Sequence, residues 1–245
     1  MLPNIKLHVE KDYSAMSKKA AEIFAEAVNT SPTGAFGFAT GSTPIGMYGD
    51  LIQMQKSGKA DLSRITAFNL DEYYPIQPCD PQSYAYFMRQ NLFDAIGLPP
   101  SNAHIPSGQA PDPIAECAAY DKKITTVGGI NMQILGIGLN GHIGFNEPTE
   151  GLMAATGYVP LAEATIESNA RHFASPEEVP RHALTMGMHG IMMARQIILL
   201  ASGESKAEIL QKALYGAITT FVPASLLQLH QDVTIVADQP AARLL

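Results

Sequence analysis

Short apolar runs that alternate with helix-forming segments are the feature of this chain that most constrains its fold. Each run has the length and composition of a buried strand, and most are followed by a small polar loop and then by apolar residues at helical spacing. Strands and helices that alternate in this way build a mainly parallel sheet with right-handed crossovers. The sequence therefore predicts an α/β fold around at least six strands: 6–9, 35–39, 65–70, 130–135, 197–201 and 233–237.

Length and charge bound the domain count and the class of partner. The 245 residues are 46% hydrophobic and contain no internal repeat, low-complexity tract or linker, so we expect one domain over residues 1–245. The net charge of −7 argues against nucleic acid as a main partner, because phosphate backbones are bound by clustered Lys and Arg. An anionic ligand would have to be held by a local site.

Targeting and cysteine patterns point to the cytoplasm. No apolar run approaches the roughly 20 residues that span a bilayer, and the first residues lack the basic-then-apolar order of a signal peptide. Cys79 and Cys117 have neither a metal-binding spacing nor the pattern of a disulfide framework. We therefore expect a cytoplasmic protein with no membrane partner.

Polar side chains gather in a glycine-rich loop, residues 136–148, directly after the run 130–135. Its glycines let the backbone turn sharply and approach a ligand closely. His142 suits proton transfer near neutral pH, and Asn140 and Glu147 supply an amide and a carboxylate beside it. Taken alone, the loop leaves a purely structural role open, because the dinucleotide-binding pattern GxGxxG is incomplete here.

The loop after the run 35–39 predicts an anion site. Unpaired N–H groups at the start of a helix favour negative charge, and hydroxyl groups in the loop can add donors. The Gly-Lys-Ser/Thr ending of a nucleotide P-loop is missing, and helix capping alone is the commoner use of such residues. The candidates for phosphate binding are Thr40, Gly41, Ser42 and Thr43.

Two further strand ends carry charged side chains. Asp71 and Glu72 follow the run 65–70, at the edge of the sheet where α/β proteins bind ligands. Adjacent side chains point in different directions, so we expect only one of the two to face the pocket; the alternative is an acidic turn in solvent. The loop 202–206 ends in Lys206. Together these strand ends suit acid–base chemistry on a small phosphorylated, polyhydroxylated substrate without a metal, since HExxH and Cys/His metal patterns are absent.

Four motifs, in order and over nearly the whole chain, resemble the motif set of glucosamine-6-phosphate deaminases, also called isomerases: 39–44, 68–73, 136–148 and 202–207. The resemblance implies a Rossmann-like three-layer sandwich, related to the 6-phosphogluconolactonase fold, and no organic cofactor. It implies conversion of D-glucosamine 6-phosphate and water to D-fructose 6-phosphate and ammonia in amino-sugar catabolism. Galactosamine-6-phosphate isomerases, which give tagatose 6-phosphate, are the nearest alternative; a 6-phosphogluconolactonase or a non-catalytic sugar-phosphate sensor is a more distant one.

The same resemblance implies a role for each candidate residue. Asp71 would be the base that moves a proton between C2 and C1 of the sugar through an enolamine. His142 would open the sugar ring, with support from Glu147. The phosphate of this small amino-sugar phosphate would be held by three groups: the loop 40–43, Arg171 and Lys206.

The chain departs from the family pattern at two places. Asn140 stands where many members have Asp, so we assign it to the architecture of the site and give it no proton-transfer role. The segment 149–160 lacks the Arg and Lys with which allosteric members bind an N-acetylated sugar-phosphate activator, so we expect the non-allosteric short form. The segment 161–180 is a candidate lid, and the sequence is compatible with a monomer or a homo-oligomer.

Overall fold

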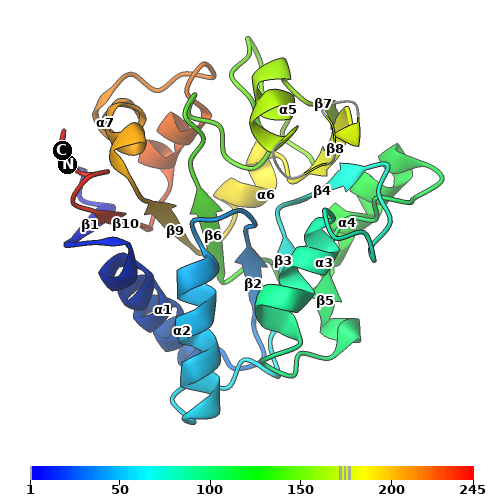
Figure 1. The fold of residues 1–245 in the computed structure, drawn as a ribbon, viewed down its shortest axis with the longest axis horizontal. Coiled ribbons are helices and arrows are strands. Elements are labelled where there is room, and N and C mark those ends of the chain that lie inside the picture. Colours follow the sequence, from blue (N-terminus) through cyan, green and yellow to red (C-terminus); the bar gives the residue numbers. More distant parts are fainter. Residues whose placement is uncertain (1, 171–172, 174, 176–177) are drawn as a thin grey trace.

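A seven-stranded parallel sheet forms the centre of the molecule (Figure 1). The computed structural model describes residues 2–170, 173, 175 and 178–245. Every pair of neighbouring strands is parallel, which confirms the predicted sheet, and each predicted run forms one of its strands. In spatial order the strands are β1 (Ile5–Glu10), β10 (Val233–Asp238), β9 (Gln196–Ala201), β6 (Met132–Gly136), β2 (Ala35–Phe38), β3 (Thr66–Asn69) and β5 (Ala103–His104).

The sequence predicts helices over about 14–28, 44–56, 83–93, 113–127 and 207–214, and helices occupy these segments, whereas the helix Glu163–Asn169 was not predicted. Asp12 and Asp112 begin the first and fourth helices by accepting hydrogen bonds from backbone N–H groups of the first turn. No helix in the described part of the chain has the length and apolar character needed to cross a membrane. The α-helices are α1 (Tyr13–Thr30), α2 (Ile45–Lys56), α3 (Tyr84–Met88), α4 (Pro113–Thr126), α5 (Glu163–Asn169), α6 (Met188–Met192) and α7 (Ala207–Tyr215).

Different helices cover the two faces of the large sheet. Phe36 and Phe38 of β2 pack against Phe24 of α1, with ring centroids 5.2 and 5.5 Å apart. Phe68 of β3 pairs in register with Gly37, which lies between Phe36 and Phe38. Because side chains alternate along a strand, Phe68 points to the opposite face of the sheet. There its ring meets Tyr120 of α4 at 5.8 Å. Helix, sheet and helix thus form the three layers of the predicted sandwich.

A second, three-stranded antiparallel sheet lies beyond the carboxyl end of β3, and the sequence analysis did not predict it (Figure 1). Its order is β4 (Asp71–Tyr74), β8 (His182–Thr185) and β7 (Gly157–Pro160). The sequence predicts a strand-end turn at 71–75, a loop or weak strand over 149–160, and the start of a strand-and-helix unit at 183–187, which corresponds to β8. These strands have four residues each and little apolar alternation, so their pairing depends on partners far away in the sequence.

The small sheet has a hydrophobic cluster of its own. Its buried members include Tyr73 of β4, Phe145 of the loop after β6, and Ile166 of α5, together with Val179 and Ala183. The ring of Tyr73 lies 5.8 Å from that of Phe145. The cluster therefore joins β4, the loop after β6 and α5 into one layer above the large sheet.

Two further short elements lie where the sequence predicts only a Pro-rich turn, 97–106, and a short apolar segment, 225–230. The Pro-rich turn 97–106 contains β5, a two-residue edge strand that pairs with β3. The apolar segment 225–230 lies largely in a 3₁₀ helix, Pro223–Leu229. Both are too short for a periodic pattern to identify them.

Candidate active site

The chain reverses its direction across the large sheet between β2 and β6. From β2 it continues to β3 and β5 on one side, and from β6 it continues to β9 and β10 on the other. In open α/β sheets, ligands bind at such a point, outside the carboxyl ends of the strands. The loops 39–44 and 137–148 leave the sheet there from neighbouring strands (Figure 1). Both were predicted to carry the site.

The loop after β2 leads into α2 without a cap from its own hydroxyl groups, and the only side chain seen to bond the first turn, among the described residues, is that of Tyr13. Gly41 has φ = +94°, which a residue with a side chain rarely adopts. The hydroxyl of Tyr13 holds the loop, donating to Ser42 O at 3.1 Å and accepting from Gly46 N at 2.8 Å. Pro44 occupies the N-cap position of α2, and its side chain makes no capping hydrogen bond. Capping, the alternative use of the loop hydroxyls, is therefore not seen, and the arrangement suits an anion.

The imidazole of His142 lies over the backbone of the loop that follows β6. Gly138 makes this possible, because a Cβ at that position would lie 2.4 Å from the ring. Two backbone hydrogen bonds of 3.0 Å close the turn, from Gly138 N to His142 O and from Gly141 N to Gly138 O. The side chain of His142 is 27% exposed, so a ligand can reach it.

The carboxylate of Glu147 is held on both oxygens. Oε2 lies 3.3 Å from His142 Nδ1, an ion-pair distance when the ring is protonated, and accepts a 2.7 Å hydrogen bond from Asn140 Nδ2. Oε1 accepts a 2.6 Å hydrogen bond from Thr165 Oγ1. Burial raises the pKa of Glu147, but the contacts with His142, Thr165 and Asn140 outweigh burial and lower it to about 2. Glu147 is therefore a permanent anion beside the imidazole.

Asn140 connects the two functional side chains of this loop. Its Nδ2 donates to Glu147, and its Oδ1 accepts a 3.1 Å hydrogen bond from the backbone N–H of His142. An amide can make both contacts because it is a donor and an acceptor at once, whereas an ionised Asp could only accept. The geometry agrees with the predicted architectural role of Asn140.

Asp71 is a buried carboxyl group with a strongly raised pKa. It is 6% exposed at the start of β4. Burial raises its pKa to about 8, and the negative charge of Glu72 acts in the same direction. A carboxylate poised in this range is a stronger base than an ordinary aspartate, as a group that removes a proton from carbon requires.

Glu72 has a structural position. Its carboxylate accepts hydrogen bonds from three backbone N–H groups, those of Tyr73 at 2.9 Å, Tyr84 at 2.8 Å and Ala85 at 2.9 Å. Burial raises the pKa of Glu72 to about 7 even though these bonds lower it. Glu72 thus ties β4 to the first turn of α3, which leaves Asp71 as the candidate of the pair for the site.

Gly144 brings the loop of His142 against Asp71. A Cβ at Gly144 would lie 3.5 Å from Asp71 Oδ2 and 3.0 Å from Thr185 Oγ1. Thr185 is the register partner of Asp71 in the small sheet, and its Oγ1 accepts a 3.0 Å hydrogen bond from Phe145 N. The structure therefore brings Asp71 and the loop of His142 together, although 71 residues separate the two in sequence.

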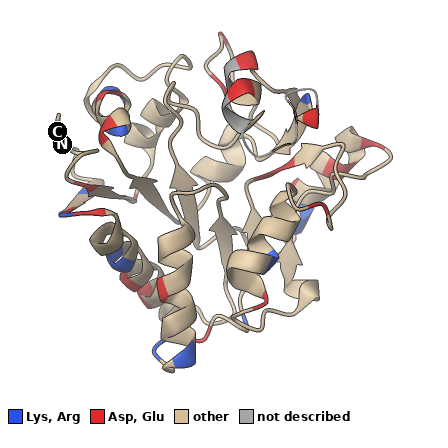
Figure 2. Ribbon diagram, viewed as in Figure 1, with Lys and Arg blue, Asp and Glu red and all other residues tan. Residues whose placement is uncertain are grey.

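Lys206 adds a positive charge to the same edge of the sheet. Its Nζ donates a 2.7 Å hydrogen bond to Ile137 O, at the end of β6. Burial lowers the pKa of Lys206. Asp238 of β10 holds the loop that carries this lysine, accepting from Ser202 Oγ and, at 3.0 Å, from Gly203 N. Figure 2 shows acidic and basic residues interspersed over the elements, so a local cation matters for an anionic ligand.

Two residues of this site were missed, and one predicted residue cannot be placed. Asp238 was not among the predicted site residues, although it directly follows a predicted strand, and no local pattern marks Thr165. Arg171, the remaining predicted phosphate ligand, lies outside the described residues. Among the described residues, no three His, Cys, Asp or Glu side chains gather as a metal site would require.

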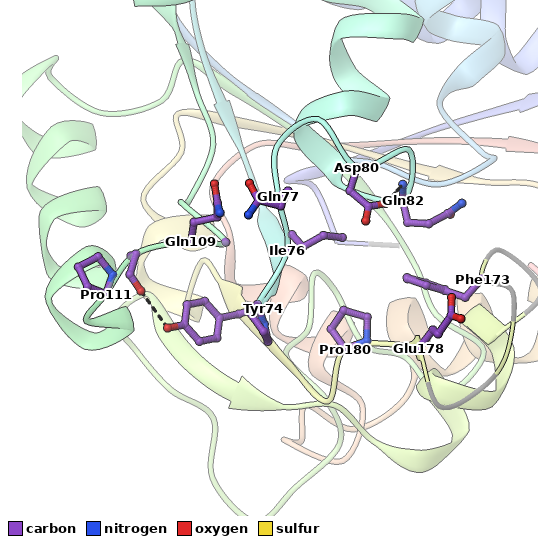
Figure 3. A pocket seen from close by; sticks show the side chains of 13 residues that line it. Tyr74, Ile76, Gln77, Asp80, Gln82, Gln109, Pro111, Phe173, Glu178 and Pro180 are labelled. Carbon is purple, nitrogen blue, oxygen red and sulfur yellow. Dashed lines mark hydrogen bonds between the residues drawn. The ribbon is translucent and has the colours of Figure 1, made fainter.

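A cavity of about 830 Å³ lies beside β4 but does not include this cluster (Figure 3). Tyr74 forms part of its wall and donates a 2.8 Å hydrogen bond to Ala110 O. The described residues that line it include the carboxylates of Asp80 and Glu178 but neither Lys nor Arg. Among the described residues its lining therefore offers no cation to a phosphate, unlike the edge that carries Lys206.

Comparison with known proteins gives concordant results. A family model described as Glucosamine-6-phosphate isomerases/6-phosphogluconolactonase matches residues 10–236. A glucosamine-6-phosphate deaminase of Halothermothrix orenii is 52% identical over 241 residues, which are 98% of this chain and 100% of the relative. One of Clostridium perfringens is 49% identical over 241 residues with the same coverage.

Solved structures agree with these sequence relatives. A monomeric glucosamine-6-phosphate deaminase superposes with a TM-score of 0.95 at 42% identity, covering 98% of this chain and 100% of the other. A 6-phosphogluconolactonase from Trypanosoma brucei superposes with a TM-score of 0.78 at 18% identity, over 98% of both chains. At that identity the likeness concerns the fold alone, and it confirms the predicted relation to the lactonase fold.

Proposed function

The chain belongs to the family of glucosamine-6-phosphate isomerases and 6-phosphogluconolactonases, and from this premise we propose that it is a glucosamine-6-phosphate deaminase. It converts D-glucosamine 6-phosphate and water to D-fructose 6-phosphate and ammonia. One observation carries the proposal. The buried carboxyl group of Asp71, whose pKa is raised, lies against the loop that carries the His142–Glu147 pair, with Gly144 at the point of contact. Relatives about 50% identical over their full length bear the same activity in their names.

The phosphate of the substrate is the handle that orients the sugar. Lys206 offers an ammonium with three donors, of which Ile137 O uses one. The loop 40–43 and the start of α2 follow β2, which lies next to β6 in the sheet, and they supply hydroxyl and N–H donors. Holding the phosphate at one end fixes the distance of C1 and C2 from the side chains that react.

Ring opening is the task of His142. The imidazole moves a proton between the ring oxygen and the anomeric hydroxyl, so that the closed sugar becomes the open-chain aldehyde. Glu147 lies 3.3 Å from Nδ1 and stabilises the imidazolium that forms during this transfer. Its pKa of about 2 means that this negative charge is present at every working pH.

Asp71 then moves a proton between two carbons. It removes the proton from C2 of the aldehyde while the C1 oxygen takes a proton from the 2-ammonium group of the substrate, which gives an enolamine, and it then returns its proton to C1. The resulting imine at C2 takes up water, and its C–N bond breaks to leave the ketone of fructose 6-phosphate and ammonia. Burial raises the pKa of Asp71 to about 8, which gives this carboxylate the basicity that a carbon acid demands.

Parallel assays on two epimeric substrates test the proposal. We expect ammonia release from glucosamine 6-phosphate with a kcat/KM at least about tenfold above that for galactosamine 6-phosphate, an effect of about 1.4 kcal/mol. Coupled detection of fructose 6-phosphate on the same samples should match the ammonia mole for mole. Preference for the galacto epimer would support the alternative substrate, and binding without ammonia release would support a sensor.

Activation is a separate property of the same enzyme. We propose that the chain works as a monomer without an allosteric activator, since the segment 149–160 carries neither Arg nor Lys and the 42% identical structural relative is monomeric. We expect hyperbolic saturation by substrate that N-acetylglucosamine 6-phosphate leaves unchanged. Light scattering in the assay buffer with substrate present should give a mass near 26.3 kDa. A sigmoidal curve that the activator makes hyperbolic would contradict this expectation.

A further inference from the structure

Helix α5 reaches into the ring-opening site through one side chain. Thr165 is 6% exposed, and its hydroxyl donates a 2.6 Å hydrogen bond to Glu147 Oε1. Its neighbour Ile166 is buried in the hydrophobic cluster of the small sheet. The same helix therefore packs on one layer with Ile166 and contacts the catalytic carboxylate with Thr165.

The bond from Thr165 determines how Glu147 faces the imidazole. A carboxylate side chain can rotate about its last bonds, and its two oxygens are equivalent until something distinguishes them. Here Thr165 occupies Oε1, which leaves Oε2 for Asn140 and His142. A hydrogen bond to a charged acceptor is short and about twice as strong as a neutral one, so this bond can hold the rotamer.

Asn140 alone cannot fix the orientation of the Glu147 carboxylate. It contacts Oε2, the oxygen that also faces His142, and is itself exposed on the loop. Without a partner on Oε1, the carboxylate could turn about the Asn140 contact and move Oε2 away from the imidazole. The contact from α5 is thus the one that anchors the far oxygen, among the contacts that the described residues make.

We propose that Thr165 is a positioning residue for ring opening, whose hydroxyl orients Glu147 toward His142 and so couples this step to the docking of α5 on the small sheet. This inference rests on the proposed function for its kinetic consequence. The orientation itself is a property of the folded chain and can be measured without substrate.

Substitution of Thr165 by valine and by serine separates positioning from packing. Thr165→Val keeps the shape and removes the donor, and we expect kcat to fall about tenfold while KM changes less than about twofold, because a lost bond to a charged group acts on the step that uses that charge. Thr165→Ser restores the donor, and we expect kcat within about threefold of the wild type. Equal losses in the two variants would overturn the proposal.

A double-mutant cycle with Glu147 gives the sharper test. In a Glu147→Ala background the hydroxyl has no carboxylate to orient, so we expect Thr165→Val to change kcat by less than about twofold there. A tenfold loss in both backgrounds would show that Thr165 acts by another route. The melting temperatures of the same four proteins give a second readout. The shifts caused by the two substitutions should again be non-additive, and additive shifts would contradict a direct bond.

Thr156 provides a matched control. It is also 6% exposed, and its hydroxyl donates to the carboxylate of Asp121 on α4, outside the Glu147 network. We expect Thr156→Val to lower the melting temperature but leave kcat within about twofold of the wild type. An equal kcat loss would overturn the specific role of Thr165. Absence of ammonia release by the wild type would refute the proposed function, whereas the melting-temperature cycle would still test the orientation of Glu147.

Discussion

Replacing Asp71 by asparagine is expected to lower kcat for ammonia release by about 10³-fold, because the amide cannot take a proton from carbon. The two side chains have nearly the same shape, and Lys206, the proposed phosphate ligand, follows another strand, so KM should stay within about threefold. Steady-state ammonia release at saturating glucosamine 6-phosphate measures the change.

A partial reaction identifies the step that fails. In D₂O the wild type should exchange the hydrogen at C2 of the substrate or introduce deuterium at C1 of the product, and NMR should show neither with Asp71→Asn. Asp94→Asn is the matched control, since it removes an exposed carboxylate and should leave turnover unchanged. Near wild-type turnover by Asp71→Asn, or retained exchange, would refute the assignment of Asp71 as the base.

The same variant should be more stable than the wild type at alkaline pH. Burial, reinforced by the charge of Glu72, raises the pKa of Asp71 from 3.8 to about 8 in the folded chain. Ionisation then disfavours the folded state, so stability falls as pH rises from about 4 to about 8. Asparagine stays neutral throughout this range. We expect a melting temperature at least about 2 °C higher at pH 8, with the gain shrinking toward pH 4.

The pKa of Asp71 also sets the pH dependence of turnover. The base must lose its proton before it can act, so kcat/KM of the free enzyme should rise with pH up to about 8. Catalysis thus needs the form that destabilises the fold, which is a stability cost accepted at a functional site.

Replacing Lys206 by methionine is expected to lower kcat/KM about 100-fold, mainly through a higher KM. The change removes the cation that the described part of the site offers to the phosphate while keeping the length and apolar packing of the side chain. Loss of a charge-assisted contact to an anion typically costs about 2–3 kcal/mol, which corresponds to a factor of this size. Saturation curves over a wide range of glucosamine 6-phosphate measure it.

Two controls tie this effect to the phosphate. Lys212→Met removes an exposed charge from α7, the helix that directly follows Lys206, and should leave KM unchanged. Inorganic phosphate should compete with substrate for the wild type and compete more weakly for Lys206→Met. A fall in kcat at unchanged KM, or undiminished inhibition by phosphate, would contradict the role of Lys206 as an anchor.

The large sheet and its loops follow from local sequence. Apolar runs such as 197–201 identify buried strands because they are continuous and of strand length, and each of the six forms a parallel strand. The glycines of 136–148 mark the loop because close approaches, such as that of Gly138 to the imidazole, exclude a side chain. Strand ends in a parallel sheet share one edge, so the motifs that follow them gather without further information.

The small sheet follows from tertiary contacts alone. Asp71 pairs with Thr185 across more than a hundred residues, and although the sequence predicts the start of a strand at 183–187, nothing in it identifies 71–74 as the partner. That pairing buries Asp71 and raises its pKa, and it turns Glu72 toward the backbone of α3. From sequence, the two carboxyl groups were interchangeable candidates for the pocket.

Sequence by itself therefore determined the fold class, the family and the set of side chains that can do acid–base chemistry, since all three depend on residue type and on short-range spacing. Only the tertiary structure decided what surrounds each of these side chains. Burial gives Asp71 its basicity, three backbone N–H groups remove Glu72 from the site, and Thr165 brings α5 to Glu147. A pKa and a rotamer depend on the surrounding atoms, and those atoms come from segments that only the folded chain places together.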